Sequence, residues 1–262
     1  MRVIVVVPTY DEAETLPGTL ARLRAAVPDA DVLVVDDGSP DGTGDLAERA
    51  AAQDAAVHVL HRSGKQGLGK AYVAGFGWAL ERGYDVVVEM DADGSHQPEQ
   101  LPRLLAQMQA AAPGGPAVDL VIGSRWVPGG SVVNWPWHRE VLSRGANTFT
   151  RLAMGLPVRD ATAGFRAYRA PVLASLHLDE VESQGYCFQV DMAWRVHLAG
   201  GVIREVPIEF VERVQGRSKM SNRIVVEALV RVTAWGAARR LSQVRSGLGR
   251  VATALRRPRQ AG

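Results

Sequence analysis

Residues 86–98 read VVVEMDADGSHQP, in which an apolar run ends in two carboxylates two positions apart, Asp91 and Asp93. Acidic residues form strands poorly, and two negative charges this close repel each other unless a positive charge lies between them. Side chains two positions apart in an extended segment point the same way. The stretch therefore predicts a buried strand at whose end Asp91 and Asp93 hold a cation.

Mg²⁺ or Mn²⁺ suits these two side chains, because both ions prefer hard oxygen ligands and leave positions for water and phosphate oxygens. A structural alternative is also open, in which residues 91–94 form a turn that leads into a helix starting at Pro98. His58, His61, His96 and His138 show no metal-ligand spacing, and no role is assigned to them.

Similar apolar runs lie on either side of this strand, and amphipathic segments separate them. Strands are expected at 3–7, 32–35, 57–60, 85–90 and 118–123, and helices near 12–27, 41–53, 68–82 and 98–111. Val-rich runs are typical of strands covered on both faces, and strand–helix alternation predicts a parallel sheet. The pattern indicates an α/β fold with a mostly parallel nucleotide-binding sheet and helices on both faces.

Beyond residue 130 the alternation fails, which predicts a mixed second half. The expected elements are a helix over 134–155, an irregular loop and strand over 158–169, a helix over 186–198 and an edge strand over 202–211 interrupted by Pro207. We expect one domain over 1–222, with halves of about 1–130 and 131–222, and a separate segment over 223–262.

Ligands of such sheets bind beyond the carboxyl ends of the strands. The loops there cover 8–12, 36–41, 62–69, 91–97 and 124–130, and four of the five carry charged or Gly-rich sequences. The Gly-rich loop 64–72 does not have the spacing of a phosphate-binding motif. It is interpreted as a tight turn that opens a helix, with Lys65 near a phosphate.

The C-terminal segment is basic and amphipathic. Seven Arg and no acid lie between Arg239 and Gly262. The whole chain has a net charge of +2, so the residues before Arg239 have a net charge of −5. Residues 224–236 place apolar side chains on one helical face, and a basic amphipathic segment can lie among lipid headgroups. Alternatively, 224–236 packs on the body and the rest is a solubilising tail. An acidic body without a basic stripe argues against nucleic acid as a partner.

Composition limits the class and location of the protein. With 47% apolar and 22% charged residues among 262, the chain resembles globular proteins. The apolar run before Pro8 is too short for a signal peptide, and no window approaches the ~20 apolar residues of a membrane-spanning helix. Cys187 is the only cysteine, which excludes an intrachain disulfide. We expect a cytoplasmic protein, peripheral on the cytoplasmic face of a membrane.

Nine motifs together carry a family resemblance. In order they are PTYDE, VVDDGSPDGT, GKQGLGKAY, MDADGSHQP, IGSRWVPGG, SRGAN, TAGFRAYR, GYCFQVDM and FVERVQGRSKMS. Over about residues 3–221 the chain resembles the polyprenyl- and dolichyl-phosphate mannose synthases, glycosyltransferase family 2 enzymes of GT-A fold. The resemblance implies transfer of mannose from GDP-mannose to a membrane polyprenyl phosphate, with inversion and a divalent cation. Some relatives carry membrane-spanning helices where this chain has none, so a separate membrane-anchor protein is expected.

The resemblance also implies the site residues. The donor site comprises Pro8, Tyr10, Glu12, Val35, Asp37, Asp91, Ala92, Asp93, Arg125, Arg213 and Lys219, with Asp91 and Asp93 as metal ligands and Arg139 in the acceptor pocket. Catalysis is assigned to Asp93, Arg125, Arg213 and Lys219. At the position of Ser95 some relatives carry a Gln that also binds metal.

The chemistry of these side chains agrees with such roles. Tyr10 can stack on a nucleobase while Glu12 hydrogen-bonds the edge of that base or the ribose. Asp37 can accept hydrogen bonds from the base or from the ribose. Arg side chains bind phosphates bidentately. Structural roles are favoured for Asp36, as a brace of its loop, and for Ser39–Asp41, as a helix cap.

Residues 212–222 are expected to close over the donor as a lid. The acceptor phosphate supplies its own charged nucleophile, since its second pKa is about 6, so catalysis is expected to be electrostatic and positional. Asp191 then orients the acceptor or pairs with an Arg, although it could serve as a base. Two rival functions are a polyprenyl-phosphate transferase that uses UDP-glucose or another sugar nucleotide, and a non-catalytic subunit that binds a sugar nucleotide and recruits a partner to membranes.

Overall fold

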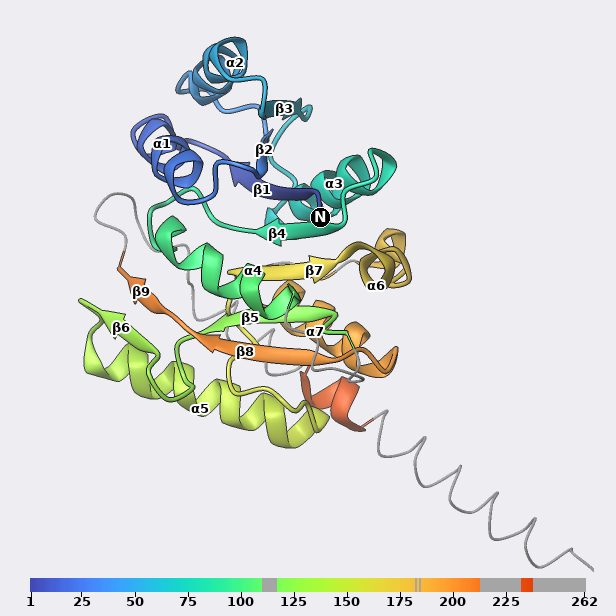
Figure 1. Ribbon diagram of the computed structural model, residues 1–262. Helices are drawn as coiled ribbons and strands as arrows, with labels where there is room; N and C mark the ends of the chain where they lie inside the picture. Colours follow the sequence, from blue (N-terminus) through green and yellow to red (C-terminus); the bar gives the residue numbers. More distant parts are fainter. Residues whose placement is uncertain (110–116, 182, 184, 213–231, 238–262) are drawn as a thin grey trace, which may run out of the picture.

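The computed structural model describes residues 1–109, 117–181, 183, 185–212 and 232–237. Strands and helices alternate in the first half, as the sequence pattern predicts (Figure 1). The elements are β1 (Val3–Thr9), α1 (Leu16–Ala26), β2 (Asp31–Asp36), α2 (Thr43–Gln53), β3 (Val57–His61), α3 (Leu68–Glu81), β4 (Val86–Glu89), the 3₁₀ turn η1 (Pro98–Gln100), α4 (Leu101–Gln109) and β5 (Leu120–Ser124).

The second half is mixed, also as predicted. Its elements are β6 (Ser131–Val133), α5 (Trp137–Met154), β7 (Arg166–Arg169), α6 (Ala170–Ala174), the 3₁₀ turn η2 (Leu178–Glu180), α7 (Tyr186–Leu198), β8 (Ile203–Pro207) and β9 (Glu209–Val211). The expected edge strand over 202–211 is two strands. Pro207 has no N–H to continue the ladder, and the backbone of Ile208 instead bonds the carbonyl of Ser124 and the N–H of Ser131.

Seven strands form one sheet in the order β3-β2-β1-β4-β7-β5-β8, and β6 pairs with β9 in a second, small sheet. All neighbours in the large sheet are parallel except β7, which is antiparallel to both β4 and β5. The α/β fold with a mostly parallel sheet is thus confirmed. The carboxyl ends of β1, β2, β3, β4 and β5 define one rim.

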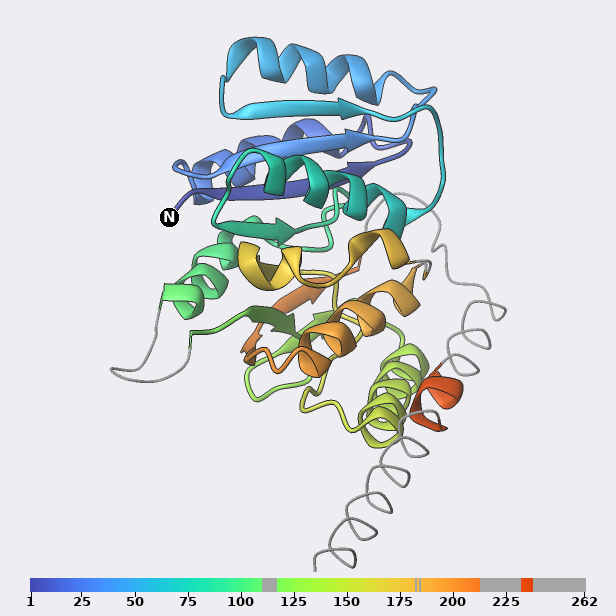
Figure 2. The same ribbon diagram turned by 90° about the vertical axis from the view of Figure 1, so that its right-hand side faces the viewer.

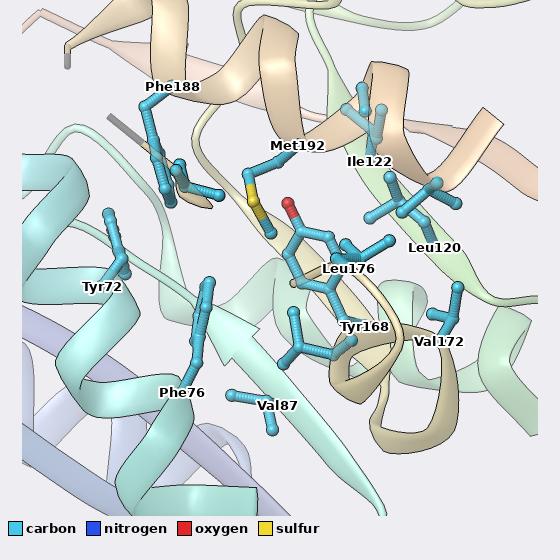
Figure 3. Packing of buried hydrophobic residues seen from close by; sticks show 14 of the residues in the cluster. Tyr72, Phe76, Val87, Leu120, Ile122, Tyr168, Val172, Leu176, Phe188 and Met192 are labelled. Carbon is cyan, nitrogen blue, oxygen red and sulfur yellow. The ribbon is translucent and has the colours of Figure 1, made fainter. Parts of the chain in front are cut away.

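Alternate side chains of the strands feed two apolar layers, one on each face of the sheet. Ile4 and Val6 of β1 pack with α3, α6 and α7, and Val5 and Val7 pack with α1 and α4. In Figure 2 the teal α3, the gold α6 and the orange α7 lie on the face of the sheet toward the viewer. Figure 3 shows the aromatic centre of this layer, where side chains of α3 and α7 meet Tyr168 of β7.

A glycine allows α3 to approach the sheet closely. A Cβ on Gly75 would overlap the Cγ1 atom of Val6. Two residues further along the helix, a Cβ on Gly77 would meet nothing within 4 Å. The sheet therefore requires a glycine only at the first of these positions.

Residues 232–237 form a helical turn against the body of the protein. Val232 is 2% exposed and belongs to the same apolar layer as α3 and α7, and Trp235 packs against that layer. A Cβ on Gly236 would lie 2.7 Å from the carbonyl oxygen of Ala153 in α5. This part of the predicted amphipathic helix packs on the body, whereas 223–231 and 238–262 lie outside the described residues.

Candidate active site

Asp91, Ala92 and Asp93 form an Asp-x-Asp segment, called the DxD segment below. Its two carboxylates lie at the carboxyl end of β4, in the middle of the sheet. Asp91 and Asp93 are half-buried, whereas Ala92 between them is buried, and its carbonyl accepts a hydrogen bond of 3.1 Å from Thr19 Oγ1. Residues 92–94 form a bend, and Asp91 and Asp93 on either side of Ala92 both keep part of their surface exposed to solvent.

Asp91 is held from both sides by side chains that the sequence pattern did not connect to it. Tyr72 Oη donates a hydrogen bond of 2.9 Å to Asp91 Oδ1, and the Asp91 N–H donates one of 3.1 Å to His96 Nδ1. Burial raises the pKa of Tyr72 well above its usual value, and the charge of Asp91 adds to this. Tyr72 is thus a neutral donor that fixes the carboxylate.

His96 is 3% exposed, and its ring stacks on Phe165 with 5.2 Å between ring centroids. Burial lowers the pKa of His96, while the charges of Asp91 and Asp93 oppose this. The imidazole is accordingly neutral at pH 7, and its Nδ1 accepts rather than donates. Its 4.0 Å approach to Asp91 Oδ2 is a contact and not an ion pair.

Asp93 is oriented by its own loop. Its Oδ1 atom accepts hydrogen bonds from the Ser95 N–H at 3.0 Å and from Ser95 Oγ at 2.6 Å. Ser95 is 2% exposed. It therefore contributes to the site by fixing Asp93.

The donor set fits a divalent ion that is shared with a phosphate ligand. Within the described part of the chain no group of three or more His, Cys, Asp or Glu side chains could hold a metal by itself. Two half-buried carboxylates two positions apart supply hard oxygen ligands, and water or phosphate oxygens would complete the shell of such an ion. Asp91 and Asp93 are the residues that would hold it.

The predicted nucleoside contacts lie at the ends of β1 and β2. Pro8 and Val35 are buried and opposite each other in the parallel register. Asp37 is 4% exposed and forms an ion pair with Arg62, and the N–H of Gln66 lies 3.4 Å from its Oδ2 atom. Arg62 and Gln66 belong to the loop after β3, which therefore covers the predicted base-reading carboxylate.

The same loop reaches Tyr10. The ammonium of Lys65 lies 3.9 Å from the centroid of the Tyr10 ring, a cation–π contact that covers one face of the ring. Glu12 lies nearby, with its Oε2 atom accepting from Thr15 Oγ1 at 2.8 Å and its N–H bonded to Thr43 Oγ1 at 3.0 Å. The predicted nucleoside residues are thus brought together at one corner of the rim.

The brace predicted for Asp36 is confirmed, whereas the predicted helix cap at 39–41 is wrong, because the N-cap of α2 is Gly42 and it has no side-chain cap hydrogen bond. Asp36 braces the loop, because its Oδ1 atom accepts from Thr9 Oγ1 at 3.1 Å and from Ser39 Oγ at 2.6 Å. Asp41 accepts the N–H of Thr43 at 3.0 Å and that of Ala13 at 3.0 Å. It thereby ties the start of α2 to the loop after β1.

Arg125 is placed in a buried ion pair at the end of β5. Its Nε and Nη2 atoms donate to the two carboxylate oxygens of Asp160 at 2.8 and 2.6 Å, and Nη2 also bonds Thr162 Oγ1 at 2.9 Å. Arg125 is 4% and Asp160 0% exposed. The guanidinium fixes the loop before β7. No sequence motif links Asp160 to Arg125, so this ion pair was not predicted.

Arg139 lies in the first turn of α5, where it pairs with Glu212 and lies 4.0 Å from the centroid of the Trp135 ring. The buried Nε1 atoms of Trp126 and Trp135 have no hydrogen-bond partner in the structure. Arg213, Lys219 and the predicted lid, apart from Glu212, lie outside the described residues. Asp191 pairs with Arg195 at 3.1 Å and accepts from Ser183 Oγ at 2.8 Å, so the structure contains the predicted Arg pair.

Two fully buried ionisable side chains lie behind Asp91. Glu89 of β4 stands opposite Arg166 of β7 in the antiparallel register, and both are fully buried. Arg166 donates to the carbonyls of Ala161, Ala163 and Gln189 at 2.6–2.7 Å. Among the described residues, neither oxygen of Glu89 has a partner at hydrogen-bond geometry, although Arg166, Gln189 and Tyr168 lie near enough to lower its pKa.

Arg166 holds the loop before β7 close to the DxD segment. A Cβ on Gly164 in this loop would lie 3.7 Å from Asp91 Oδ2 and 3.5 Å from His96 Cε1. In the sequence, Glu89 and Arg166 each lie in a strand of mainly apolar character, and nothing there links the two. They come together only because β7 inserts antiparallel beside β4.

A nucleotide-binding sheet with two carboxylates at the end of its central strand defines a glycosyltransferase domain of GT-A type. The model of Glycosyl transferase family 2 matches residues 4–176, and the chain belongs to this family.

Two curated relatives align over nearly the whole chain. "Undecaprenyl-phosphate mannosyltransferase" of Micrococcus luteus is 60% identical over 95% of this chain and 100% of the relative. "Polyprenol monophosphomannose synthase" of Mycolicibacterium smegmatis is 54% identical over 93% of this chain and 90% of the relative.

Among solved structures, the fold is similar to glucosyl-3-phosphoglycerate synthase from Mycobacterium tuberculosis in complex with Mn²⁺, UDP-glucose and phosphoglyceric acid. The TM-score is 0.63 and the identity 20%, over 88% of this chain and 79% of the other. At this identity the likeness concerns the fold alone.

Proposed function

We propose that the protein transfers mannose from GDP-mannose to a polyprenyl monophosphate. The observation that carries the proposal is that two partly exposed carboxylates, Asp91 and Asp93, lie just beyond the carboxyl end of β4, at the same rim of the sheet as Tyr10 and Asp37. The names of the two relatives, which are 60% and 54% identical, support the sugar and the acceptor.

In this reaction a phosphate oxygen of the acceptor attacks C1 of mannose. The bond between C1 and the diphosphate breaks, GDP leaves with the electron pair, and the configuration at C1 inverts. A divalent ion, Mg²⁺ or Mn²⁺, supplies positive charge for the departing diphosphate. Asp91 and Asp93 would hold this ion, and hydrogen bonds with Tyr72, His96 and Ser95 fix these two residues.

No catalytic base is required, because the acceptor phosphate carries its own charge above its second pKa of about 6. Asp191 agrees with this mechanism. It is 7% exposed, and its two oxygens are engaged by Arg195 and Ser183. Arg213 and Lys219 are proposed to bind the phosphates, and Arg139 to meet the acceptor, as cations that pair with phosphate oxygens.

The buried position of Arg125 suggests a narrower role than the predicted one. Asp160 and Thr162 engage its Nε and Nη2 atoms. We infer that Arg125 shapes the donor site by fixing the loop before β7, in addition to any charge it lends to the diphosphate.

The runner-up function is a transferase that uses UDP-glucose or another sugar nucleotide. Base selection is expected at the corner where Arg62 pairs with Asp37 and Lys65 covers Tyr10. A carboxylate at that corner can accept the N–H groups of guanine or the imide N–H of uracil, so the assay below decides between the two donors.

Since the acceptor is a membrane lipid, the protein is proposed to act as a peripheral protein on the cytoplasmic face of a membrane. Residues 223–262 are proposed to contribute through their basic amphipathic sequence, and a separate anchor protein is proposed to assist. Among the described residues no helix is both long and apolar enough to cross a bilayer.

Radiolabelled GDP-mannose and UDP-glucose, each incubated with the protein, Mn²⁺ and vesicles that contain polyprenyl phosphate, test this function. We expect label in the lipid fraction from GDP-mannose only, and its loss in Asp93→Asn. The matched control is Asp29→Asn, an exposed carboxylate before β2, which is expected to keep full transfer. Donor binding without transfer by the wild type would instead favour the non-catalytic subunit.

A further inference from the structure

A cluster of three aromatic side chains joins the end of β5 to the small sheet. Trp126 follows β5, Trp135 follows β6, and Phe210 lies in β9. The ring of Trp135 is edge-on to the other two, with 6.3 Å from its centroid to that of Trp126 and 5.5 Å to that of Phe210. Figure 1 shows β6 and β9 side by side. Their pairing brings segments that are far apart in the sequence into one cluster.

Three arginines contact the rings of this cluster. The guanidinium carbon of Arg139 lies 4.0 Å from the centroid of Trp135, and that of Arg144 lies 4.2 Å from the centroid of Trp126. The guanidinium carbon of Arg125 lies 5.4–5.5 Å from all three centroids. Contacts of this length are attractive cation–π interactions. The rings thus gather three positive charges around the place where the acceptor phosphate is proposed to bind.

Each of these arginines is already paired with a carboxylate. The pairs are Arg125 with Asp160, Arg144 with Glu140, and Arg139 with Glu212. Together the three pairs have no net charge, so they provide no excess positive charge for an anion. A phosphate monoester brings a charge of about −1.5 to −2 at neutral pH, and it would repel a carboxylate on the same guanidinium. For a phosphate to bind here, one carboxylate must leave its arginine.

Of the three carboxylates, Glu212 is the one that a phosphate can replace. Asp160 is fully buried and accepts hydrogen bonds of 2.6–2.9 Å from the backbone N–H, Nε and Nη2 of Arg125. Glu140 belongs to a partly exposed pair within α5. The Glu212 side chain is 27% exposed, and its Oε1 atom bonds Arg139. Its Oε2 atom has no hydrogen-bond partner among the described residues.

Two donors in the cluster also lack a partner. The Nε1 atoms of Trp126 and Trp135 are buried and have no hydrogen-bond partner in the described part of the chain. Together with Glu212 Oε2 they are three buried polar atoms that do not satisfy one another in this arrangement. A buried polar atom without a partner costs free energy. A phosphate brings three strong acceptor oxygens, one more than the carboxylate of Glu212, and so brings an additional acceptor for these donors.

We propose that the carboxylate of Glu212 occupies the position of the acceptor phosphate on Arg139 and is displaced when a phosphate monoester binds. The exchange involves the side chain, since the N–H of Glu212 bonds the carbonyl of Val133 at 3.0 Å and fixes the backbone. Glu212 is then an internal competitor that lowers the affinity for the acceptor and for the product, so that the product phosphate leaves. The inference rests on the proposed function, which assigns the acceptor phosphate to Arg139.

Calorimetric titration of the full chain with geranyl phosphate, a short water-soluble prenyl phosphate, tests the competition. Chelator is present, so that the phosphate does not bind a metal ion at Asp91 and Asp93. Glu212→Gln is expected to bind geranyl phosphate at least about tenfold more tightly than the wild type. This is the gain expected if Glu212 holds Arg139 in at least about nine of ten molecules. Glu212→Ala removes the carboxylate without adding an amide and is expected to give a similar gain.

Arg139 provides the test of where the phosphate binds. Arg139→Gln is expected to bind geranyl phosphate weakly, and adding Glu212→Gln to it should give no gain, because the contested guanidinium is absent. The matched control Glu140→Gln removes a carboxylate from the neighbouring pair with Arg144 and is expected to bind like the wild type. A gain from Glu212→Gln that persists without Arg139 would overturn the proposal, because the phosphate would then bind elsewhere.

Weaker binding by both Glu212 variants would overturn the proposal by showing that the carboxylate orients Arg139 for the phosphate. Unchanged binding would equally overturn it. Methyl geranyl phosphate, a singly charged diester as the product is, separates displacement from repulsion. A displaced carboxylate lowers the affinity for monoester and diester by the same factor, so Glu212→Gln should strengthen both equally. A gain confined to the monoester would show that Glu212 stays beside the bound phosphate, against the proposal.

Transfer assays separate this inference from the proposed function. With geranyl phosphate as the acceptor, Glu212→Gln is expected to lower the KM for the acceptor and to leave the KM for GDP-mannose unchanged. Wild-type transfer combined with an unchanged acceptor KM in the variant would contradict the inference alone. If the wild type transfers no mannose from GDP-mannose, the proposed function fails, and the binding of geranyl phosphate still reports on Glu212 and Arg139.

Discussion

The backbone N–H of Asp91 donates a hydrogen bond of 3.1 Å to Nδ1 of His96, five residues further along the chain. This bond closes the DxD loop on a buried, neutral imidazole. Residues that orient metal ligands affect metal affinity or activity by about 10–100-fold. His96 is therefore a positioning residue of the site.

His96→Ala is expected to raise the Mn²⁺ concentration required for half-maximal transfer by about tenfold or more. Transfer from GDP-mannose to a short-chain acceptor, followed across a Mn²⁺ titration, measures this. His138→Ala, which alters an exposed imidazole of α5, is the control. An unchanged Mn²⁺ requirement in a folded His96→Ala variant would show that the imidazole supports the loop only structurally.

Asp160→Asn is expected to destabilise the protein strongly, because it leaves the guanidinium of Arg125 buried without a counter-charge. Breaking a buried pair of this kind costs about 3–5 kcal/mol, measurable as a decrease in the free energy of unfolding in urea. Glu99→Gln breaks the surface pair between Arg22 and Glu99, in which both side chains are about half exposed, and should cost less than about 1 kcal/mol. Similar losses in the two variants would refute the structural role assigned to the Arg125–Asp160 pair.

Gly75→Ala and Gly77→Ala are expected to change stability in opposite directions. The first adds a methyl group that overlaps Val6, and such overpacking costs about 1–3 kcal/mol. The second adds a methyl group with nothing within 4 Å, in a helix where Ala is favoured over Gly by about 1 kcal/mol. Thermal melting of both variants checks this, and a stabilising Gly75→Ala would mean that α3 packs less closely on β1.

Glu89 predicts a pH dependence of stability. Burial raises the pKa of its carboxyl group from 4.5 to about 7, against the opposing charge of Arg166. Because the folded state binds this proton more tightly than the unfolded state, stability falls as pH rises from about 4.5 to 7 and then levels off. The effect is on the order of 3 kcal/mol.

Glu89→Gln removes this titration. The difference in unfolding free energy between wild type and variant, measured without metal, should therefore change in favour of the variant as pH rises from 5 to 7. A difference that stays constant over this range would show that Glu89 has the same pKa in the folded and unfolded states.

The first half of the fold and the position of Asp91 and Asp93 beyond a strand end were predictable because their signals are local. Val-rich runs mark β1, β2 and β4, and Asp91 and Asp93 follow β4 closely in the sequence. The supports of that pair were not predictable. Tyr72, Arg166 and Asp160 reach the site across the sheet or from distant loops. Strand β7 runs antiparallel to both of its neighbours, β4 and β5, and no periodic pattern in the sequence predicts this insertion.

The predicted nucleoside contacts at Tyr10 and Asp37 could be predicted only in part. Tyr10 and Asp37 were placed at strand ends by the alternation of strands and helices, whereas their contacts with Lys65 and Arg62 depend on the course of a loop. That course follows from the φ values of Gly64 and Gly67, +154° and +99°, which glycine adopts readily.

The central claim is that Asp91 and Asp93 hold a divalent ion that neutralises the donor diphosphate. Calorimetric titration of GDP-mannose into the wild type and into Asp93→Ala, each with Mn²⁺ and with chelator, tests it most directly. Wild-type affinity is predicted to rise at least about tenfold with Mn²⁺, while the variant binds equally weakly under both conditions. A variant whose affinity still rises with Mn²⁺ as much as that of the wild type would contradict the account.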